Sequence, residues 1–301
     1  MSRFHDYLTS EVVEDYSDGI INRREAMHRL SLLGMAVAVA LPLLAACDSL
    51  GSAGGSGGPT TAAPGNATPA GPSAQPTEAI TFDGPEGWEV QGAWAAADKP
   101  RGAVLVVHEN RGLTDHIRSV AGRLATSGYS ALAVDLLSAE GGTASFESEA
   151  EVSAALNNAP DGRFVADMKA AIDELERRAP DAKVGVVGYC FGGGMVWTLL
   201  ASGEPRLAAA VPFYGPLPEG ADFAGSSNAA VLGIYAEQDE RVNASRDAAT
   251  AALQKAGLTH EIVTFPGAGH AFFNDTGQRY NPTAAASAYE QLMDWFGTHL
   301  S

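Results

Sequence analysis

A cysteine flanked by glycines is the first candidate for chemistry in this chain. Gly188, Cys190 and Gly192 follow the apolar, β-branched run 183–187 and precede a second apolar run, so a strand, a tight turn and a helix are expected. A nucleophile in such a turn adopts a strained backbone, and glycines two positions away avoid a clash of side chains. Backbone N–H groups at the helix N-terminus would favour a thiolate, and the amide of Phe191 would bind an oxyanion.

The same pattern has two other interpretations. Glycine-rich turns before helices are common, so Cys190 could be a structural residue at a packing corner. It could also sense oxidation through a sulfenate. The chain holds one other cysteine, Cys47, and the expected lipidation of Cys47, described below, removes it as a disulfide or resolving partner. An unpaired thiol in this turn therefore favours a nucleophile.

Acid and base candidates follow the cysteine in order. Asp239 comes 49 residues after Cys190 and follows the apolar run 230–235, while His270 comes 31 residues later, after the run 261–265. All three would stand at the carboxyl ends of neighbouring strands, where open α/β sheets bind ligands. His270 would take the thiol proton, and Asp239 would orient the imidazole. Alternatively, Asp239 could be a solvated loop charge, and His270 could be an ordinary surface histidine.

From about Glu78 to the C-terminus, the chain resembles the dienelactone hydrolase family of α/β-hydrolases. The residues that carry the resemblance are Gly-Tyr-Cys-Phe-Gly-Gly at 188–193, Asp239, Gly-His-Ala-Phe at 269–272 and His-Glu-Asn-Arg-Gly at 108–112. The resemblance implies a carboxymethylenebutenolidase-type hydrolase that cleaves a carboxylic ester or enol-lactone bond of a small molecule. It also implies a Cys-His-Asp triad, a thioester acyl-enzyme and no cofactor.

The resemblance adds two residues that follow the apolar run 103–107. A glutamate at the position of Glu109 hydrogen-bonds the resting thiol in that family, so Glu109 would hold Cys190 until substrate displaces it. The backbone N–H of Asn110 would be the second oxyanion donor, beside that of Phe191. From the residues alone, Glu109 could equally be an ion-pair partner within the loop.

The chain departs from the family at the arginines that hold a substrate carboxylate. Asp-Leu-Leu-Ser-Ala at 135–139 and Asn274, four residues after His270, stand where the dienelactone-specific enzymes supply them. Arg111 is the candidate substitute for substrate binding, with Arg279 as a second, and each could equally be a surface charge. Because bidentate carboxylate capture needs arginine geometry, the substrate stays open. The alternatives are a broad-specificity thioesterase or carboxylesterase, and a non-catalytic ligand-binding protein on the same scaffold.

Short apolar runs alternate with amphipathic segments from residue 78 onward. This alternation predicts an α/β protein with a mainly parallel sheet, helices on both faces and an antiparallel N-terminal edge, as the α/β-hydrolase fold requires. Residues 140–160 carry no clear period and could either cap the pocket or bridge two elements. The expected edge strands are 79–82 and 88–94; the expected parallel strands are 103–107, 130–134, 183–187, 208–213, 230–235 and 261–265; the expected helices cover 117–125, 164–175, 195–201, 244–255 and 289–296.

Residues 1–46 are expected to be an export signal. The charge-free apolar run 30–46 follows the pair Arg23-Arg24 and ends in Leu-Ala-Ala-Cys, which resembles the lipobox of bacterial lipoproteins. Cys47 would then receive lipid and anchor the protein to the extracytoplasmic side of the cell membrane. The arginine pair raises the twin-arginine route beside the general secretion route, and an uncleaved transmembrane anchor is the alternative.

A linker and a catalytic domain follow the signal. Residues 47–77 hold the lipidated cysteine and a run of Gly, Ser, Ala, Pro and Thr that cannot bury enough apolar surface to fold, so a flexible tether is expected. Residues 78–301 form one dienelactone-hydrolase-like domain, expected to be a monomer. The formal net charge of −17 leaves no basic footprint for nucleic acid, and no metal-binding spacing such as His-Glu-x-x-His occurs, so neither is an expected partner.

Overall fold

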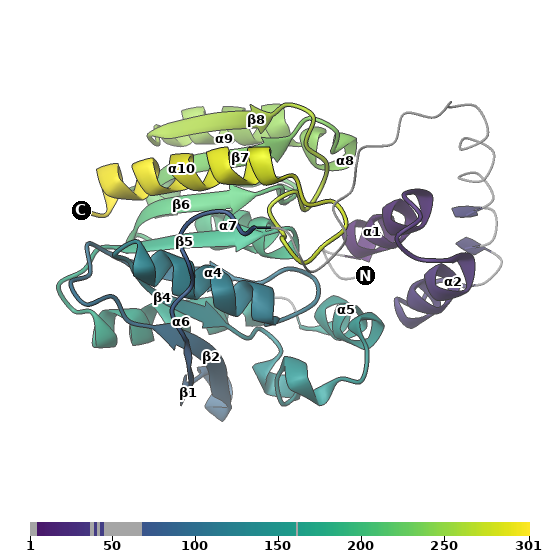
Figure 1. The fold of residues 1–301 in the computed structure, drawn as a ribbon, viewed down its shortest axis with the longest axis horizontal. Helices are drawn as coiled ribbons and strands as arrows, with labels where there is room; N and C mark the ends of the chain where they lie inside the picture. The colour runs from purple at the N-terminus through teal and green to yellow at the C-terminus, as the bar shows by residue number, and fades with distance from the viewer. Residues whose placement is uncertain (1–4, 37–38, 41–42, 45–67, 161) are drawn as a thin grey trace.

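One mixed sheet organises the chain from residue 78 onward (Figure 1). The computed structural model describes residues 5–36, 39–40, 43–44, 68–160 and 162–301. Within them, eight strands lie in the order β1-β2-β4-β3-β5-β6-β7-β8. Their bounds are β1 (Glu78–Asp83), β2 (Glu89–Ala95), β3 (Ala103–Val107), β4 (Ser130–Val134), β5 (Val184–Tyr189), β6 (Leu207–Phe213), β7 (Ala230–Ala236) and β8 (His260–Phe265).

The antiparallel part of the sheet is confined to its N-terminal edge. β1 pairs with β2, and β2 with β4, in antiparallel register, whereas the pairs from β4 through β8 are parallel. Every residue of β3, β4 and β5 is buried, which explains why these strands are continuous apolar runs rather than alternating ones. The predicted mainly parallel sheet with an antiparallel N-terminal edge is confirmed.

Helices cover both faces of this sheet. Figure 1 shows α4 and α10 across the near face, while α6 and α7, which contact each other, lie behind it. Each helix predicted from apolar spacing is present, with longer bounds at most ends. The bounds are α4 (Asp115–Thr126), α6 (Arg163–Arg178), α7 (Phe191–Ala201), α9 (Arg246–Ala256) and α10 (Pro282–His299), with the short α8 (Glu240–Asn243) before α9.

The segment without a clear period forms a rim beside the carboxyl ends of the strands. It contains two short 3-10 turns, η2 (Ser138–Glu140) and η3 (Thr143–Ser145), and the helix α5 (Glu149–Asn158). The Ser148 side chain caps α5 by accepting a hydrogen bond from the Glu151 amide. The Ser153 hydroxyl of α5 donates to the Asn110 carbonyl at 3.0 Å, so of the two alternatives left open for this segment, α5 lies at the pocket.

Two helices precede the sheet and lie against its functional edge. They are α1 (His5–Ser17) and α2 (Arg23–Leu32), which contact each other and α5. Figure 1 places α1 beside the strand ends, close to the start of α7. The sequence predicts an export signal here and indicates nothing about this contact. Among the described residues, no helix combines the length and the apolar character needed to cross a membrane.

The expected linker is described only in its last residues. Cys47 and residues 51–67 lie outside the described residues. Residues 68–76, which the composition assigns to the flexible tether, lie instead along α4. Arg123 and Thr126 of α4 donate hydrogen bonds at 2.9 Å to the carbonyls of Ala70 and Ser73, so these linker residues are bound to the domain.

Candidate active site

The turn between β5 and α7 has the strained geometry expected for a nucleophile. Cys190 has φ +57° and ψ −118°, a conformation that costs a side-chain-bearing residue about 1–3 kcal/mol. Its glycine neighbours are required by close backbone contacts. A Cβ on Gly188 would lie 2.2 Å from the Gly192 carbonyl oxygen, and a Cβ on Gly192 would lie 2.3 Å from the Val107 carbonyl oxygen. The expected strand, tight turn and helix are therefore present around Cys190.

His270 and Asp239 meet at the same edge of the sheet. Asp239 follows β7 and His270 follows β8, and the distance from His270 Nδ1 to Asp239 Oδ2 is 2.6 Å. Asp239 also accepts a hydrogen bond from the Val242 amide at 3.1 Å, which orients the carboxylate. Both side chains are buried, and a ring nitrogen of His270 lies within 4.8 Å of the Cys190 sulfur. The structure thus brings together the three residues predicted to act as nucleophile, base and orienting acid.

Two residues of α1 complete this cluster, and sequence reasoning missed both. The Tyr7 hydroxyl lies 3.2 Å from Cys190 Sγ and 3.5 Å from His270 Nε2. Glu11 Oε1 lies 3.2 Å from His270 Nε2, and Glu11 Oε2 accepts from the Cys190 thiol at 3.8 Å. No spacing rule relates residues 179 positions apart, so the sequence held no signal for this contact.

The Glu11 carboxylate changes the protonation of the cluster. Burial disfavours a charged imidazole, but Glu11 and then Asp239 outweigh it and raise the pKa of His270 well above its ordinary value. Burial and then the charge of Glu11 raise the pKa of the Cys190 thiol, against the opposing effect of His270. Burial raises the pKa of Glu11, but His270 and Arg241 more than offset that, so this pKa is lowered. With α1 in place, the neighbouring charges favour imidazolium and neutral thiol.

Glu109 is buried but does not make the contact that the family resemblance implies. Its Oε2 accepts a hydrogen bond from Asn274 Nδ2 at 2.5 Å. In the described part of the chain the thiol bonds to Tyr7 and Glu11, and Glu109 Oε1 has no partner. The expected Glu109–Cys190 hydrogen bond is not formed among the described residues, and the carboxylate that contacts the sulfur is that of Glu11. Asn274, which stands in place of a family arginine, orients Glu109.

The two predicted oxyanion donors lie on different elements, Asn110 in the segment after β3 and Phe191 at the start of α7. His108 accepts from the Leu136 amide through Nε2 at 3.1 Å, so its Nδ1 is the protonated nitrogen and donates to the Glu109 carbonyl at 2.6 Å. Burial lowers the pKa of His108, in agreement with a neutral ring. This bond fixes the segment in which Asn110 lines the cavity, while Phe191 begins α7 directly after Cys190. Both stand beside the thiol, and their backbone N–H groups remain the predicted oxyanion donors.

Three arginines from β3 onward lie near the site. Arg111, the expected substrate-binding residue, is half-exposed and lies 3.3 Å from a Glu149 carboxylate oxygen, so it joins α5 to the segment after β3. Arg279 lies 2.9 Å from Asp15 of α1. Arg241, which sequence reasoning missed, pairs with Glu11 and lies over the ring of Tyr7, 4.4 Å from its centroid. Its place two residues after Asp239 was the signal that could have found it.

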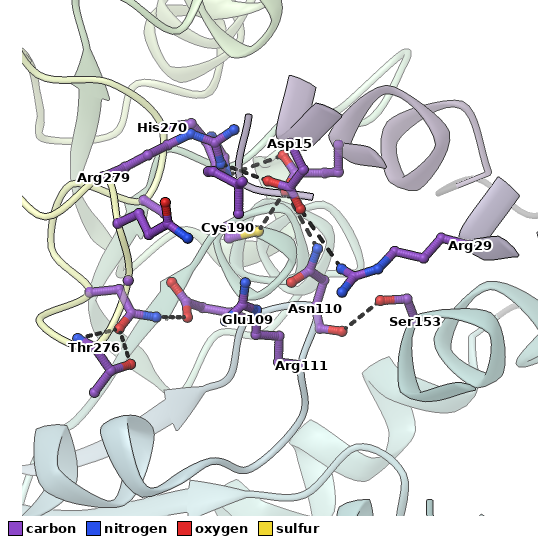
Figure 2. A pocket seen from close by; sticks show the side chains of 16 residues that line it. Asp15, Arg29, Glu109, Asn110, Arg111, Ser153, Cys190, His270, Thr276 and Arg279 are labelled. Carbon is purple, nitrogen blue, oxygen red and sulfur yellow. Dashed lines mark hydrogen bonds and ion pairs between the residues drawn. The ribbon is translucent and has the colours of Figure 1, made fainter. Parts of the chain in front are cut away.

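A cavity of about 160 Å³ remains between these elements. Figure 2 shows Cys190, Glu109, Asn110 and His270 at this cavity, with Asp15 of α1 near His270 and Arg29 of α2 entering from the right. Among the described residues, Glu11, Cys190 and His270 each offer one atom that could ligate a metal, within 4.8 Å of one another. Two of these three are also the expected nucleophile and base. The cluster therefore belongs to this site rather than to a separate metal centre.

The sheet order, the strained cysteine turn and the loops after β7 and β8 define an α/β-hydrolase fold, which solved dienelactone hydrolases share. Residues 90–300 match the family described as "Dienelactone hydrolase family". The chain therefore belongs to the dienelactone hydrolase family, and it is a dienelactone hydrolase-like hydrolase. Such enzymes act on small-molecule esters or lactones.

Curated relatives and solved structures extend over the same part of the chain. A Salmonella typhi protein named "Putative carboxymethylenebutenolidase" is 33% identical over 216 residues, covering 68% of this chain and 80% of that protein. A Bradyrhizobium sp protein named "Probable 2-oxo-3-(5-oxofuran-2-ylidene)propanoate lactonase" is 29% identical, covering 66% of this chain and 84% of its own length. The Klebsiella pneumoniae structure titled "Putative Dienelactone Hydrolase" has a TM-score of 0.64 and 29% identity, over 75% of this chain and all of that one.

Proposed function

We propose that this enzyme hydrolyses a carboxylic ester or enol-lactone bond through Cys190, His270 and Asp239, with a thioester acyl-enzyme as intermediate. The observation that carries the proposal is the pairing of a strained, buried cysteine at the start of α7 with a histidine whose Nδ1 lies 2.6 Å from Asp239. Asp239 fixes the tautomer of His270, so that Nε2 is the nitrogen directed toward the thiol side of the site.

The first half-reaction forms the thioester. His270 Nε2 accepts the Cys190 proton, and the sulfur attacks the carbonyl carbon of the bound ester. The backbone N–H groups of Phe191 and Asn110 receive the oxyanion, and one such preorganised donor is worth roughly 10²–10³ in rate. His270 then returns the proton to the leaving oxygen as the C–O bond breaks. In a lactone, that oxygen stays attached to the acyl group.

The second half-reaction restores the enzyme. His270 Nε2 accepts a proton from water, and the hydroxide oxygen attacks the thioester carbonyl. The C–S bond breaks, and the imidazolium returns its proton to the Cys190 sulfur. Asp239 stabilises the imidazolium in both halves, since its carboxylate is buried and paired to Nδ1. Each step uses only this chain's residues, substrate and water.

We propose an enol lactone as the preferred substrate class. The lactonase name of the Bradyrhizobium relative favours an enol lactone, and the site at Cys190 would also accept the carbonyl of an aryl ester or a thioester. A panel of these three classes separates a lactone-selective enzyme from a broad-specificity thioesterase or carboxylesterase. Equal turnover of all three would favour the broad enzyme.

The test of the mechanism is Cys190→Ala in the full chain. Turnover of the best substrate in the panel is expected to fall to background, while the melting temperature stays within a few degrees, since Ala removes only the sulfur. Intact mass spectrometry after rapid quenching should detect one acyl group on wild-type protein and none on the variant. A Cys190→Ala protein with undiminished turnover contradicts the proposal.

The export signal and the anchor are a separate proposal supported by sequence alone. The arginine pair, the apolar run 30–46 and Cys47 favour a lipoprotein at the extracytoplasmic side of the membrane. Metabolic labelling with palmitate tests it, because label that persists in Cys47→Ser would contradict lipidation at this residue.

A further inference from the structure

We propose that residues 5–32 are an inhibitory segment of the uncleaved chain: the active-site mouth is a docking surface for the acidic helix α1, docked α1 blocks Cys190, and signal cleavage before Cys47 would remove the block. Loss of hydrolysis follows from the docking of α1 only if the proposed function holds. The block of the Cys190 thiol by α1 does not depend on that function. The ligand of the active-site mouth is therefore an acidic helix, α1, from the N-terminal part of the same chain.

Helix α1 occupies the space that a substrate carbonyl needs. A reacting carbonyl carbon must come to within about 3–3.5 Å of the attacking sulfur. The Tyr7 hydroxyl lies 3.2 Å from Cys190 Sγ, and Glu11 Oε2 lies 3.8 Å from it. Tyr7, Glu11 and Cys190 are all buried, at 7%, 5% and 3% exposure. Docked α1 leaves only the cavity of about 160 Å³ beside Cys190, which is small for a ligand site, so a substrate carbonyl is expected to reach the sulfur only when α1 is displaced.

The docked helix also removes the general base. His270 Nδ1 lies 2.6 Å from Asp239, and His270 Nε2 lies 3.2 Å from Glu11. An imidazole with a carboxylate at each nitrogen donates both hydrogen bonds only as imidazolium, which cannot accept the thiol proton. Glu11 therefore blocks the chemistry as well as the approach.

Charge complementarity explains why α1 docks at this place. Its acidic residues Glu11, Glu14 and Asp15, together with Asp18 directly after the helix, follow the i, i+3, i+4, i+7 spacing of one helix face. They meet two arginines, Arg241 of α8 and Arg279 of the loop after β8. Arg241 pairs with Glu11 and lies 3.0 Å from Glu14. In a chain with net charge −17, an acidic helix would be repelled from most of the surface, so these arginines make the mouth selective for it.

The second arginine and the apolar face complete the docking. Arg279 lies 2.9 Å from Asp15 and 2.7 Å from Asp18. Leu8 and Val12 of α1 are buried. Behind α1, Arg29 of α2 lies 3.5 Å from Glu149 of α5, so α2 fastens the segment to the rim of the pocket. In the uncleaved chain the segment is covalently attached, which makes its binding intramolecular and favours the docked state.

The test weakens the docking of α1 by substitutions that do not contact Cys190 or His270. In the full chain, Asp15→Lys with Asp18→Lys replaces the attraction to Arg279 by repulsion. Asp6→Lys, at an exposed position of the same helix, is the matched control. The rate of Cys190 alkylation by iodoacetamide, followed by peptide mass spectrometry to distinguish it from Cys47, is expected to rise roughly tenfold or more in the double variant. The control should stay within about twofold of wild type.

A second measurement separates release of α1 from unfolding. A synthetic peptide of residues 5–32, added in excess to the double variant, is expected to slow alkylation again, which it cannot do for an unfolded chain. The triple variant with Arg279→Glu restores opposite charges and is expected to recover part of the protection. Alkylation that is as fast in wild type as in the double variant overturns the inference, as does a peptide that leaves the rate of the double variant unchanged.

Hydrolysis of the substrate panel is measured on the same proteins. A parallel rise of alkylation and hydrolysis in the double variant supports both the inhibitory segment and the proposed function. A rise of alkylation without hydrolysis of any panel member supports the block at the thiol and contradicts the proposed function. The two claims therefore fail on different readouts.

Discussion

The two sides of the active site are held by different forces. On one side, Cys190, Asp239 and His270 stand at the ends of β5, β7 and β8, whose backbone hydrogen bonds and buried residues form the core of the domain. On the other side, α1 is held largely by ion pairs to Arg241 and Arg279 and by a few apolar side chains. The first side cannot leave without unfolding the domain, whereas the second can. The reactive groups therefore form a permanent side of the site, fixed by the folded domain. The blocking groups of α1 form a conditional side, which can dissociate while the domain stays folded.

The permanent side depends on close backbone packing at the cysteine turn. Gly192→Ala should give the largest effect, because the added Cβ would lie 2.3 Å from the Val107 oxygen and 2.5 Å from the His108 oxygen. Neither backbone can move without disturbing β3, so we expect a loss of about 3 kcal/mol or more, or no folded protein. Thermal unfolding by circular dichroism measures it.

Gly297→Ala is the control for this substitution. Its Cβ would meet nothing closer than the Tyr129 hydroxyl at 3.8 Å, and alanine favours the helix α10. Its melting temperature should match or exceed that of wild type. If Gly192→Ala has the same melting temperature as Gly297→Ala, close backbone packing at the turn does not determine the conformation of Cys190.

The next largest expected effect is a loss of turnover on substitution of Asp239, without a loss of folding. Asp239→Asn, made in the Asp15→Lys/Asp18→Lys background so that α1 does not limit turnover, should lower turnover by roughly 10³–10⁴ because the imidazole loses its orienting charge. Substrate hydrolysis under single-turnover conditions measures it. Glu240→Gln, at the exposed neighbour, should leave turnover unchanged. If Asp239→Asn and Glu240→Gln lower turnover equally, the effect comes from the negative charge of the loop and not from the ion pair between Asp239 and His270.

The smallest effect is the dependence of α1 docking on pH. The pKa of His270 is raised above its ordinary value near 6.5, so its charge stabilises docked α1 fully below that pH and is lost as pH rises through the raised pKa. The pKa of Glu11 is lowered from about 4.5, so its contribution is present above that value and is lost as pH falls through the lowered pKa. Docking should be tightest between these limits.

Alkylation of Cys190 as a function of pH tests this. The full chain should react with a midpoint at alkaline pH, and the Asp15→Lys/Asp18→Lys variant should react with a midpoint at lower pH, since burial under α1 and the charge of Glu11 no longer raise the pKa of the thiol. Asp6→Lys should follow wild type. Coincident profiles for wild type and the double variant would show that α1 does not set the reactivity of the thiol.

Much of the permanent side could be predicted because its signals are local. The bounds of β3 and β4 agree with the apolar runs 103–107 and 130–134, since a strand buried on both faces must be apolar throughout. The strained cysteine turn follows from its glycines. The order of nucleophile, acid and histidine predicted that all three would meet, because parallel strands end at one edge.

The contacts of Glu109 and Arg111 could not be predicted, because each depends on a partner distant in the sequence. Glu109 bonds Asn274, 165 residues away, and not the thiol. Arg111 pairs with Glu149 of a segment whose sequence has no clear period. Neither apolar spacing nor motif order carries information about which of several charged side chains will meet in a loop.

The amino-acid sequence by itself determined the α/β architecture, the family and the three residues at the strand ends, because burial and tight-turn geometry act over a few neighbouring residues. Only the tertiary structure decided that an acidic helix would lie on those residues. Complementary charges act across space without a local sequence pattern, so the place of Glu11 beside His270 and Cys190 became apparent only with the folded chain.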